Sequence, residues 1–477
     1  MSMRTLFLPL TFALLLSACA SLPSSRPPES VQLALDKAGL TAENLGVVAF
    51  PLDARNSGLR LQPDRPLQPA SNMKLVTAAV SLDKLGPNYR ARTDLLADAP
   101  VLNGVIDGPL YLRGGADPDF DWGALNSLLR DLRDQGVREI RGGVVVDRSF
   151  FNPARSDIGL PPFDEQPEFP YNVIPDALML NGNLLDFVLE SDANTLRVRV
   201  TPALPGITVD TSDIQLVDAP CKDWEDRWKI PTTTQQVTVH LHGEFPRNCT
   251  VRQELNVLDR QWVAAQAVRQ MWHELGGTIS GSNPDAEGPT PATARVLATH
   301  RGRPLAEELR GVMKRSDNAL ARLSYLNIGA AQAQAGESTA AAAERAVRQW
   351  FDAHNIPTEG LVLDNGSGLS RSERISAAQL AGLLAASYDG SHGPELLSTL
   401  PVAGVDGTLS RRMKGTPAEG RARMKTGTLN NAVGLAGYVP DASGRIWVVA
   451  AIVNAPQAGR GRAVLDAVTL WVSAQQR

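Results

Sequence analysis

Six residues near the start of the chain, Pro69-Ala-Ser-Asn-Met-Lys74, place a serine and a lysine three positions apart at the beginning of an apolar helical run. The periodicity over residues 71–85 predicts a helix, with Ser71 at its N-terminus and Lys74 one turn further along the same face. The positive end of the helix dipole favours an incipient alkoxide on the serine. A desolvated lysine with a lowered pKa accepts the hydroxyl proton, so this stretch predicts an activated nucleophile.

An SxxK pattern alone is weak evidence, because a capping serine followed by a solvated lysine produces the same spacing. Ser81-Leu-Asp-Lys84 repeats the pattern inside the same predicted helix. No helix start is available there to activate Ser81. We therefore interpret the second copy as a chance match and Ser71 with Lys74 as the candidate pair.

A second motif, Ser316-Asp-Asn318, follows a helical run and is the only SxN sequence in the chain. The Ser316 hydroxyl can relay a proton between a lysine and a leaving nitrogen. The Asn318 amide can hold a substrate amide and the catalytic lysine in place. A helix cap is the structural alternative for this motif taken alone.

The third motif, Lys425-Thr-Gly-Thr428, is the only KTG sequence and lies on a predicted strand over residues 423–429. On an exposed strand, Lys425 and Thr426 can bind a carboxylate. Gly427 removes a side chain where a substrate backbone lies close. A solvated edge strand ending at a glycine is the structural alternative.

Together, SxxK, SxN and KTG in this order, on a helix, a helix and a strand, are the signature set of the serine penicillin-recognising enzymes. The chain resembles one family of these, the low-molecular-mass class C penicillin-binding proteins, which are D-alanyl-D-alanine carboxypeptidase/endopeptidases. The resemblance covers nearly all of the chain after about residue 31. Supporting stretches are Ala177-Leu-Met-Leu-Asn-Gly-Asn183, Asp364-Asn-Gly-Ser-Gly-Leu369, Leu400-Pro-Val-Ala-Gly404 and Asp406-Gly-Thr-Leu409.

The resemblance implies an α+β fold of the penicillin-binding/β-lactamase-like serine transpeptidase type, an antiparallel sheet flanked by helices, with a large β-rich insert. Short apolar runs that alternate with Gly, Pro and Asp assign residues 95–255 to the insert, which we expect to form two subdomains. Residues 31–94 and 256–477 then form the split catalytic domain. Within it, we expect a helical stretch at 305–328 and strands at 423–429, 432–439 and 446–453.

The resemblance also implies residue roles. Ser71 is the acylated nucleophile, Lys74 its general base, and Ser316 the catalytic serine of the second motif. The backbone N–H groups of Ser71 and Thr428 form the oxyanion hole. The residues expected to bind substrate are Asn318, Lys425, Thr426, Gly427 and Thr428. This chemistry needs no metal or cofactor, and we assign no metal to His240 and His242, which alternate on a predicted strand.

The implied function is hydrolysis of peptidoglycan stem peptides or cross-links through an acyl-enzyme, with β-lactams as covalent inhibitors. The enzymatic alternative is a β-lactamase, which the long insert disfavours because class A β-lactamases have a much shorter gap between the first two motifs. A non-catalytic, envelope-anchored binding protein is the other alternative, and the intact motif residues argue against it. Both carboxypeptidase and endopeptidase reactions use the same site, so the sequence does not choose between them.

The N-terminus is typical of a secretory signal over residues 1–18, with Arg4 followed by an apolar stretch at 6–16. Leu16-Ser-Ala-Cys19 resembles a bacterial lipobox, in which Cys19 becomes the lipidated first residue of the mature chain. A plain signal peptide with a cysteine at its cleavage site is the alternative. Residues 19–30, rich in Pro and Ser, then form a tether. We expect an exported, periplasmic protein that is anchored to a membrane by lipid.

Export places Cys221 and Cys249 in an oxidising compartment, and they are the only possible internal pair once Cys19 is lipidated. We expect a disulfide between them, with two buried free thiols as the alternative. The 477 residues carry 47 Lys+Arg and 51 Asp+Glu, a formal net charge of −4. That balance argues against a nucleic-acid partner bound by charge neutralisation. No apolar run reaches the roughly 18 residues that span a bilayer, which excludes a polytopic membrane protein.

Overall fold

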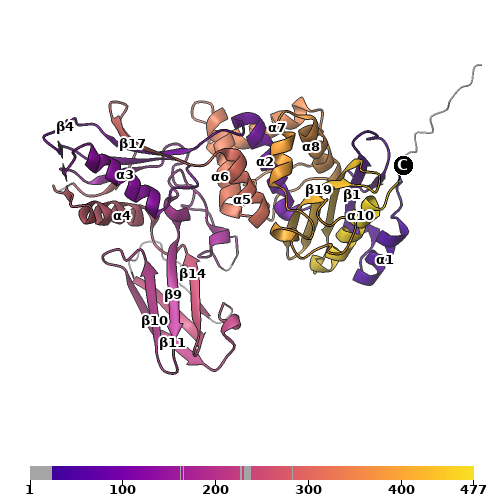
Figure 1. Ribbon diagram of the computed structural model, residues 1–477, viewed down its shortest axis with the longest axis horizontal. Coiled ribbons are helices and arrows are strands. Elements are labelled where there is room, and N and C mark those ends of the chain that lie inside the picture. The colour runs from indigo at the N-terminus through magenta and orange to yellow at the C-terminus, as the bar shows by residue number, and fades with distance from the viewer. Residues whose placement is uncertain are drawn as a thin grey trace, which may run out of the picture.

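The computed structural model describes residues 24–161, 163–164, 166–225, 228–229, 238–281 and 283–476. The predicted signal sequence, Cys19 and residues 20–23 of the tether lie outside this part. The molecule is elongated, with a sheet built from the two ends of the chain at one end and the middle of the chain at the other (Figure 1). No helix of the described part is both long and apolar enough to cross a membrane.

A five-stranded antiparallel sheet forms the centre of the first domain. Its strand order is β18-β19-β20-β1-β2, so strands from the C-terminal region lie beside strands from the N-terminal region. The strands are β18 (Arg423–Leu429), β19 (Ala432–Pro440), β20 (Ile446–Asn454), β1 (Leu45–Pro51) and β2 (Leu59–Leu61). This arrangement confirms the predicted α+β fold with an antiparallel sheet flanked by helices.

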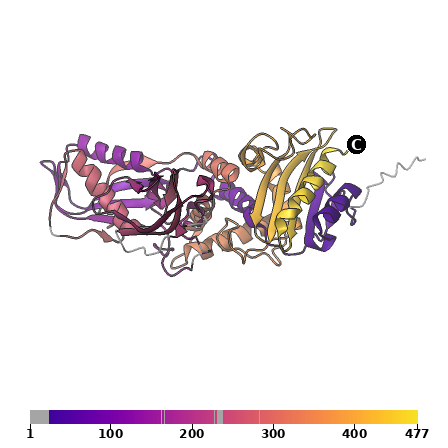
Figure 2. The ribbon, with the colours of Figure 1, turned by 90° about the horizontal axis from the view of Figure 1, so that it is seen from below.

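Successive side chains along each strand point to opposite faces of this sheet, and apolar side chains bury both faces. In β20, Val448 and Ala450 pack on one side, and Val449 and Ala451 pack on the other. Figure 2 shows helices on both faces. One face is covered by α2 (Met73–Leu85), α5 (Leu305–Arg315), α6 (Asn318–Gln332), α7 (Thr339–Ala353), α8 (Ala377–Asp389) and α9 (Gly393–Thr399). The other face is covered by α1 (Glu29–Ala38) and α10 (Arg462–Ser473).

The helical stretch expected at 305–328 is two helices rather than one. The break lies at Ser316, which ends α5 in the left-handed conformation with φ 62° and ψ 38°. Asp317 then caps α6, because its side chain accepts a hydrogen bond from the N–H of Leu320 at 3.0 Å. The helical spacing of apolar residues continues across the break, and so it did not reveal the turn that presents the second motif.

The first part of the insert is a mixed sheet with the strand order β16-β8-β6-β3-β17, covered by two helices. Its strands are β3 (Arg92–Ala97), β6 (Leu110–Gly115), β8 (Val144–Asp147), β16 (Ala286–Glu287) and β17 (Arg295–Arg301). A smaller sheet contains β4 (Val101–Leu102), β5 (Val105–Ile106), β7 (Glu139–Ile140) and β15 (Thr278–Ile279). The helices are α3 (Trp122–Asp134) and α4 (Arg260–Glu274).

Two differences from the sequence prediction follow. Residues 260–301, expected in the catalytic domain, pack into the insert core instead, since Val268 and Trp272 of α4 contact the same cluster as Leu95 and Leu112. The insert therefore ends at about residue 301 rather than at 255. The helix α3 was missed within a region described as β-rich.

The second part of the insert projects from the first as two three-stranded sheets packed face to face (Figure 1). One sheet contains β10 (Leu196–Thr201), β9 (Leu185–Ser191) and β14 (Thr250–Leu255). The other contains β11 (Thr208–Val217), β13 (Thr238–Pro246) and β12 (Trp228–Lys229). Cys221 and Cys249 form a disulfide here, as the sequence analysis expected.

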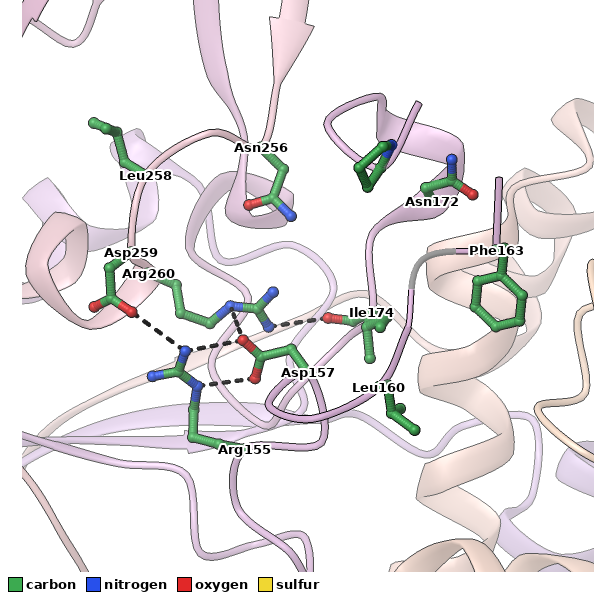
Figure 3. A pocket seen from close by; sticks show the side chains of 11 residues that line it. Arg155, Asp157, Leu160, Phe163, Asn172, Ile174, Asn256, Leu258, Asp259 and Arg260 are labelled. Atoms are coloured by element: carbon green, nitrogen blue, oxygen red, sulfur yellow. Dashed lines mark hydrogen bonds and ion pairs between the residues drawn. The ribbon is translucent and has the colours of Figure 1, made fainter. Parts of the chain in front are cut away.

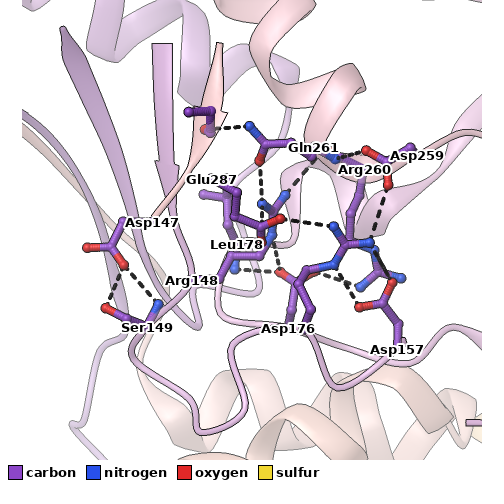
Figure 4. Close-up of polar contacts among 12 residues, drawn as sticks. Asp147, Arg148, Ser149, Asp157, Asp176, Leu178, Asp259, Arg260, Gln261 and Glu287 are labelled. Carbon is purple, nitrogen blue, oxygen red and sulfur yellow. Dashed lines mark hydrogen bonds and ion pairs between the residues drawn. The ribbon is translucent and has the colours of Figure 1, made fainter. Parts of the chain in front are cut away.

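A buried ion network ties together the segments of the insert that lie nearest the catalytic domain (Figure 4). Arg148 and Asp176 are both fully buried and lie 3.2 Å apart. Asp176 also pairs with Arg260 at the start of α4, at 2.6 Å. Glu287 on β16 accepts from Arg148 at 3.3 Å. Each charge therefore has an opposite partner, which a buried charge requires.

Candidate active site

The three sequence motifs meet at the edge of the first domain, where α2, the α5–α6 turn and β18 come together. Ser71 lies in a 3₁₀ turn, Ala70–Asn72, that leads into α2. Ala70 has φ 49°, so the chain turns sharply just before the serine. The Nζ of Lys74 lies 3.1 Å from Ser71 Oγ. The predicted pairing of Ser71 and Lys74 on one helical face is therefore present in the structure.

Lys74 is fully buried and is held by two further acceptors. Its Nζ donates to Asn318 Oδ1 at 2.7 Å and to the backbone oxygen of Ser367 at 2.6 Å. Burial lowers the pKa of Lys74 to about 7, although the negative charges of Asp317 and Glu373 raise it. A lysine with this pKa exchanges protons near neutral pH, which suits a general base.

The second lysine, Lys425 on β18, meets the second motif. Its Nζ donates to Ser316 Oγ at 2.8 Å and to the backbone oxygen of Thr426 at 2.7 Å. Lys425 is fully buried, and burial, followed by the charge of Lys74, holds its pKa well below the usual value. The sequence predicts that this lysine lies on an exposed strand. Lys425 is instead buried, with its ammonium directed at Ser316.

Strand β18 also brings two threonine hydroxyl groups to the site. Thr426 Oγ1 bonds the hydroxyl of Thr408 at 2.7 Å, and Thr428 is exposed. Of the third motif, Thr428 is therefore exposed, whereas Thr426 is buried like Lys425. Thr408 belongs to a stretch that supported the resemblance, but the sequence alone gave no sign of its contact with β18.

Gly427 has a structural reason in addition to the one predicted. A Cβ at this position would lie 2.6 Å from the backbone oxygen of Pro69 and 2.7 Å from Asn72 Oδ1. The glycine therefore lets β18 pack directly against the turn that carries Ser71. Asn72 strengthens this contact, since its Nδ2 donates to the backbone oxygen of Lys425 at 2.9 Å.

A loop over residues 364–373 completes the site, and the sequence analysis gave it no role. Its Ser367 carbonyl accepts from Lys74, and a Cβ at Gly368 would lie 1.8 Å from the backbone oxygen of Ala70. The loop is held from inside by Glu373, whose Oε1 accepts from the N–H of Gly366 at 3.0 Å. Burial raises the pKa of Glu373 to about 7. The sequence around Glu373, Ser370-Arg-Ser-Glu-Arg374, is polar and gives no sign that this carboxylate is buried.

The insert contributes to the site through residues 171–173. Asn318 Nδ2 donates to the backbone oxygen of Tyr171 at 3.1 Å, so one amide links Lys74 to the insert. Arg322, one turn along α6, donates to the backbone oxygen of Val173 at 3.0 Å. A cavity of about 240 Å³ next to this segment is lined by the Arg155–Asp157 pair and by Asn172 (Figure 3). From the sequence, this region is assigned only to the β-rich insert, with no role at the site.

The second SxxK copy lies away from the site. Ser81 is fully buried, and its hydroxyl is 3.5 Å from the backbone oxygen of Ser324. Lys84 is exposed and lies 3.4 Å from its neighbour Asp83. The serine and lysine of this second copy therefore contact other residues and not each other. In the insert, His240 pairs with Asp210 at 3.1 Å, and the described residues hold no cluster of three potential metal-ligating side chains.

Comparison with known proteins agrees with the family resemblance that the three motifs indicate. Residues 29–475 match the D-Ala-D-Ala carboxypeptidase 3 (S13) family. The chain is 30% identical over 468 residues to a D-alanyl-D-alanine carboxypeptidase of Actinomadura sp. (strain R39), covering 93% of this chain and 83% of that protein. The crystal structure of penicillin binding protein 4 (dacB) from Haemophilus influenzae has a TM-score of 0.78 at 24% identity, and the match covers 93% of this chain and 99% of that one.

The same Haemophilus influenzae protein complexed with a novel beta-lactam gives a TM-score of 0.75 at 23% identity, over 93% of this chain and 99% of that one. These two structural matches show the fold. The family match extends over almost the whole chain and includes all three motifs. The chain therefore belongs to the D-Ala-D-Ala carboxypeptidase 3 (S13) family of serine peptidases.

Proposed function

We propose that this protein is a serine-type D-Ala-D-Ala carboxypeptidase, a D,D-endopeptidase, or both, and that it acts on peptidoglycan stem peptides or cross-links through an acyl-enzyme on Ser71. One observation carries the proposal. The buried amine of Lys74, with a pKa of about 7, lies 3.1 Å from the Ser71 hydroxyl. Neutral Lys74 can therefore take the hydroxyl proton as the serine attacks a D-Ala peptide carbonyl.

The proton then needs a route to the leaving nitrogen. Ser316 is suited to provide it, because its hydroxyl accepts from Lys425 at 2.8 Å and stands at the same edge of the site. Protonation by this route releases the C-terminal D-amino acid, or the second stem peptide in a cross-link, as a free amine. A water molecule then attacks the acyl-enzyme, and the hydroxyl of Ser71 is regenerated. Asn318 orients Lys74 and the substrate amide.

The tetrahedral intermediates carry a negative charge that needs donors already in place. The backbone N–H groups of Ser71 and Thr428 are the proposed donors, each worth about 3–4 kcal/mol of transition-state stabilisation. The close packing of Gly427 on the Ser71 turn supports this pairing, since it holds β18 against the nucleophile. The exposed Thr428 and the Thr426–Thr408 pair offer hydroxyl groups for the substrate carboxylate.

β-Lactams are expected to acylate Ser71 by the same attack, and the β-lactam complex of the Haemophilus influenzae relative supports this expectation. A β-lactamase is the alternative enzymatic function. A non-catalytic binding protein is the other alternative. The complete set of contacts among Ser71, Lys74 and Asn318 and between Ser316 and Lys425 disfavours the non-catalytic alternative.

Purified muropeptides test the proposal. The protein is incubated with a disaccharide pentapeptide and, separately, with a cross-linked dimer, and D-Ala release and dimer cleavage are followed by chromatography. The expected result is loss of D-Ala, cleavage of the dimer, or both, with no turnover by Ser71→Ala. Fast hydrolysis of penicillin without reaction on either muropeptide would instead assign the protein as a β-lactamase.

Export and anchoring form a separate part of the proposal, and they rest on the sequence of residues 1–30 alone. The signal sequence supports action in the periplasm, and Cys19 in its lipobox-like context supports lipid anchoring. Cys19→Ala should lose membrane association while the released protein keeps its activity on muropeptides. Equal membrane fractionation of the variant and the wild type would contradict the anchor.

A further inference from the structure

A cavity of about 650 Å³ lies where the insert meets the C-terminal half of α6. Figure 1 shows the sheet that contains β17 reaching toward this helix. The cavity is lined by four arginines and one aspartate: Arg90, Arg92, Arg113, Arg301 and Asp94. The lining charges sum to +3. The cavity in Figure 3 differs, because its arginines are paired with aspartates.

Two of the arginines face each other across strands. Arg301 at the end of β17 is the register partner of Arg92 at the start of β3. Like charges directly opposite each other destabilise a sheet. Gly115 is the partner of Arg92 on the other side, so β6 places no side chain directly opposite Arg92. Within the described residues, the Arg301 guanidinium has no hydrogen bond or ion pair. A bound anion would relieve this repulsion.

Of the remaining charges in the cavity, Asp94 pairs with Arg113, and Arg90 donates to the backbone oxygen of Gly302 at 3.0 Å. Asp94 is buried and accepts from Arg113 at 2.9 Å and from the Thr299 hydroxyl at 2.7 Å. Arg92 lies further from Asp94, at 3.5 Å, and its side chain is 56% exposed. Asp94 therefore pairs most closely with Arg113, while the exposed Arg92 is held only by its longer ion pair with Asp94, and Arg301 has no ion pair within the described residues. Arginine guanidinium groups bind carboxylates through two parallel hydrogen bonds.

Uncharged groups around the arginines suit a peptide. Asn327 of α6 borders the cavity and is buried, yet neither its Nδ2 nor its Oδ1 has a partner among the described residues. Phe150 lines the same cavity and is 42% exposed. An amide without partners and an exposed ring offer contacts to the amide and apolar parts of a ligand. An inorganic anion would use neither of them.

The cavity is separate from the active site. Asn327 follows Asn318 by nine residues on α6, about two and a half turns, which places the two side chains on opposite sides of the helix. Asn318 faces Lys74 and Tyr171, whereas Asn327 faces the cavity side. A molecule bound there does not contact Ser71.

We propose that Arg92 and Arg301 form a second, non-catalytic binding site for a carboxylate-bearing peptide fragment of peptidoglycan. The proposal rests on the proposed function for the source of the ligand. The cavity volume lies in the range of small-molecule binding sites, about 300–1,000 Å³. A peptidoglycan hydrolase with such a site can hold one stem peptide while it cleaves another.

Binding is measured by titration calorimetry on the full chain after acylation with benzylpenicillin, which blocks the active site. The probe is a disaccharide tripeptide with free carboxylates, and the comparison ligands are its fully amidated form and inorganic pyrophosphate. We expect the free-carboxylate probe to bind the acylated protein. Arg92→Gln/Arg301→Gln should weaken that binding by about 10-fold or more. Arg295→Gln is the matched control, because Arg295 is an exposed arginine at the other end of β17.

Thermal unfolding separates a binding role from a structural one. Arg301→Gln removes a like-charge neighbour of Arg92, so the free variant should melt no lower than the wild type, while the probe should stabilise only the wild type. Absence of binding to acylated wild type, equal binding of the amidated probe, or equal binding of pyrophosphate would overturn the proposal. Absence of an acyl adduct would count against the proposed function instead. The same titration on unmodified protein would then still test the dependence on the arginines.

Discussion

The ammonium of Lys74 lies 2.6 Å from the backbone oxygen of Ser367, closer than the 3.1 Å that separates it from the hydroxyl of Ser71. The lysine is thus positioned by a loop almost 300 residues away in the sequence as well as by its own helix. A backbone acceptor has no titratable group of its own, so it orients the amine without changing charge. The position of this loop should therefore control acylation.

Gly368→Ala tests the position of the loop. Its new Cβ would lie 1.8 Å from the backbone oxygen of Ala70, so the loop has to move away from the Ser71 turn. We expect penicillin acylation to slow by about 100-fold, the order of loss associated with a 1 Å displacement of a catalytic group. Gly336→Ala is the control, because Gly336 has a similar φ of +79° and nothing within 4 Å. Equal rates in both variants would show that the loop does not position Lys74.

Glu373 should set the pH dependence of acylation. Lys74 acts as a base only when neutral, and its pKa is about 7, so the acylation rate should rise with pH through about 7. Ionised Glu373 raises the pKa of Lys74. Glu373→Gln keeps an acceptor for the N–H of Gly366 but removes the charge, and so the rising limb should move to lower pH. A stopped-flow pH profile measures the shift, and an unmoved limb would contradict the coupling.

Lys425→Ala separates carboxylate binding from proton transfer. If the lysine charge attracts the substrate carboxylate, kcat/KM for a D-Ala-D-Ala substrate should fall by roughly 10- to 150-fold, the equivalent of about 1.5–3 kcal/mol. A substrate with an amidated C-terminus lacks the carboxylate and should lose much less. Since Lys425 Nζ lies 2.8 Å from Ser316 Oγ, equal losses on both substrates would assign the lysine to the Ser316 proton route.

Asp176→Asn should destabilise the insert. Asp176 is fully buried between Arg148 and Arg260 (Figure 4), and its loss leaves two buried guanidinium groups without their shared carboxylate. Removal of one partner from a buried pair costs about 3–5 kcal/mol of folding free energy. Glu190→Gln, which breaks the exposed pair with Arg199, should cost less than about 1 kcal/mol. Thermal unfolding followed by circular dichroism compares the two, and equal midpoints would contradict the structural role.

The sequence predicted the parts of the molecule that depend on local pattern or on residues with a narrow chemical use. Ser71 with Lys74 was predicted by helical spacing, and the strand over 423–429 by its apolar alternation. The pairing of Cys221 with Cys249 was predicted because no other internal pair is possible once Cys19 is lipidated. The two ends of the chain, which the sequence assigns to one split domain, contribute strands to one sheet, and the S13 family match agrees with the resemblance drawn from the motifs.

The rest depends on contacts between distant segments, which local patterns do not contain. Ser367 and Tyr171 act through backbone oxygens, so their side chains carry no signal of the role. The burial of Lys425 depends on packing around β18, and a lysine gives no sign of it in sequence. The insert boundary was placed too early because the helical pattern of α4 does not show whether the helix packs against the catalytic domain or the insert. Only its contact with Leu95 and Leu112 assigns it to the insert.

The assignment of Ser71 as the nucleophile is tested most directly by mass spectrometry of the intact protein after incubation with benzylpenicillin. We predict one penicilloyl adduct, mapped by peptide sequencing to Ser71, that is absent in Ser71→Ala and retained in Ser81→Ala. Ser81 is the matched control because it has the same SxxK spacing but is buried against Ser324, away from Lys74. An adduct that persists in Ser71→Ala, or that maps to another residue, would contradict the central claim.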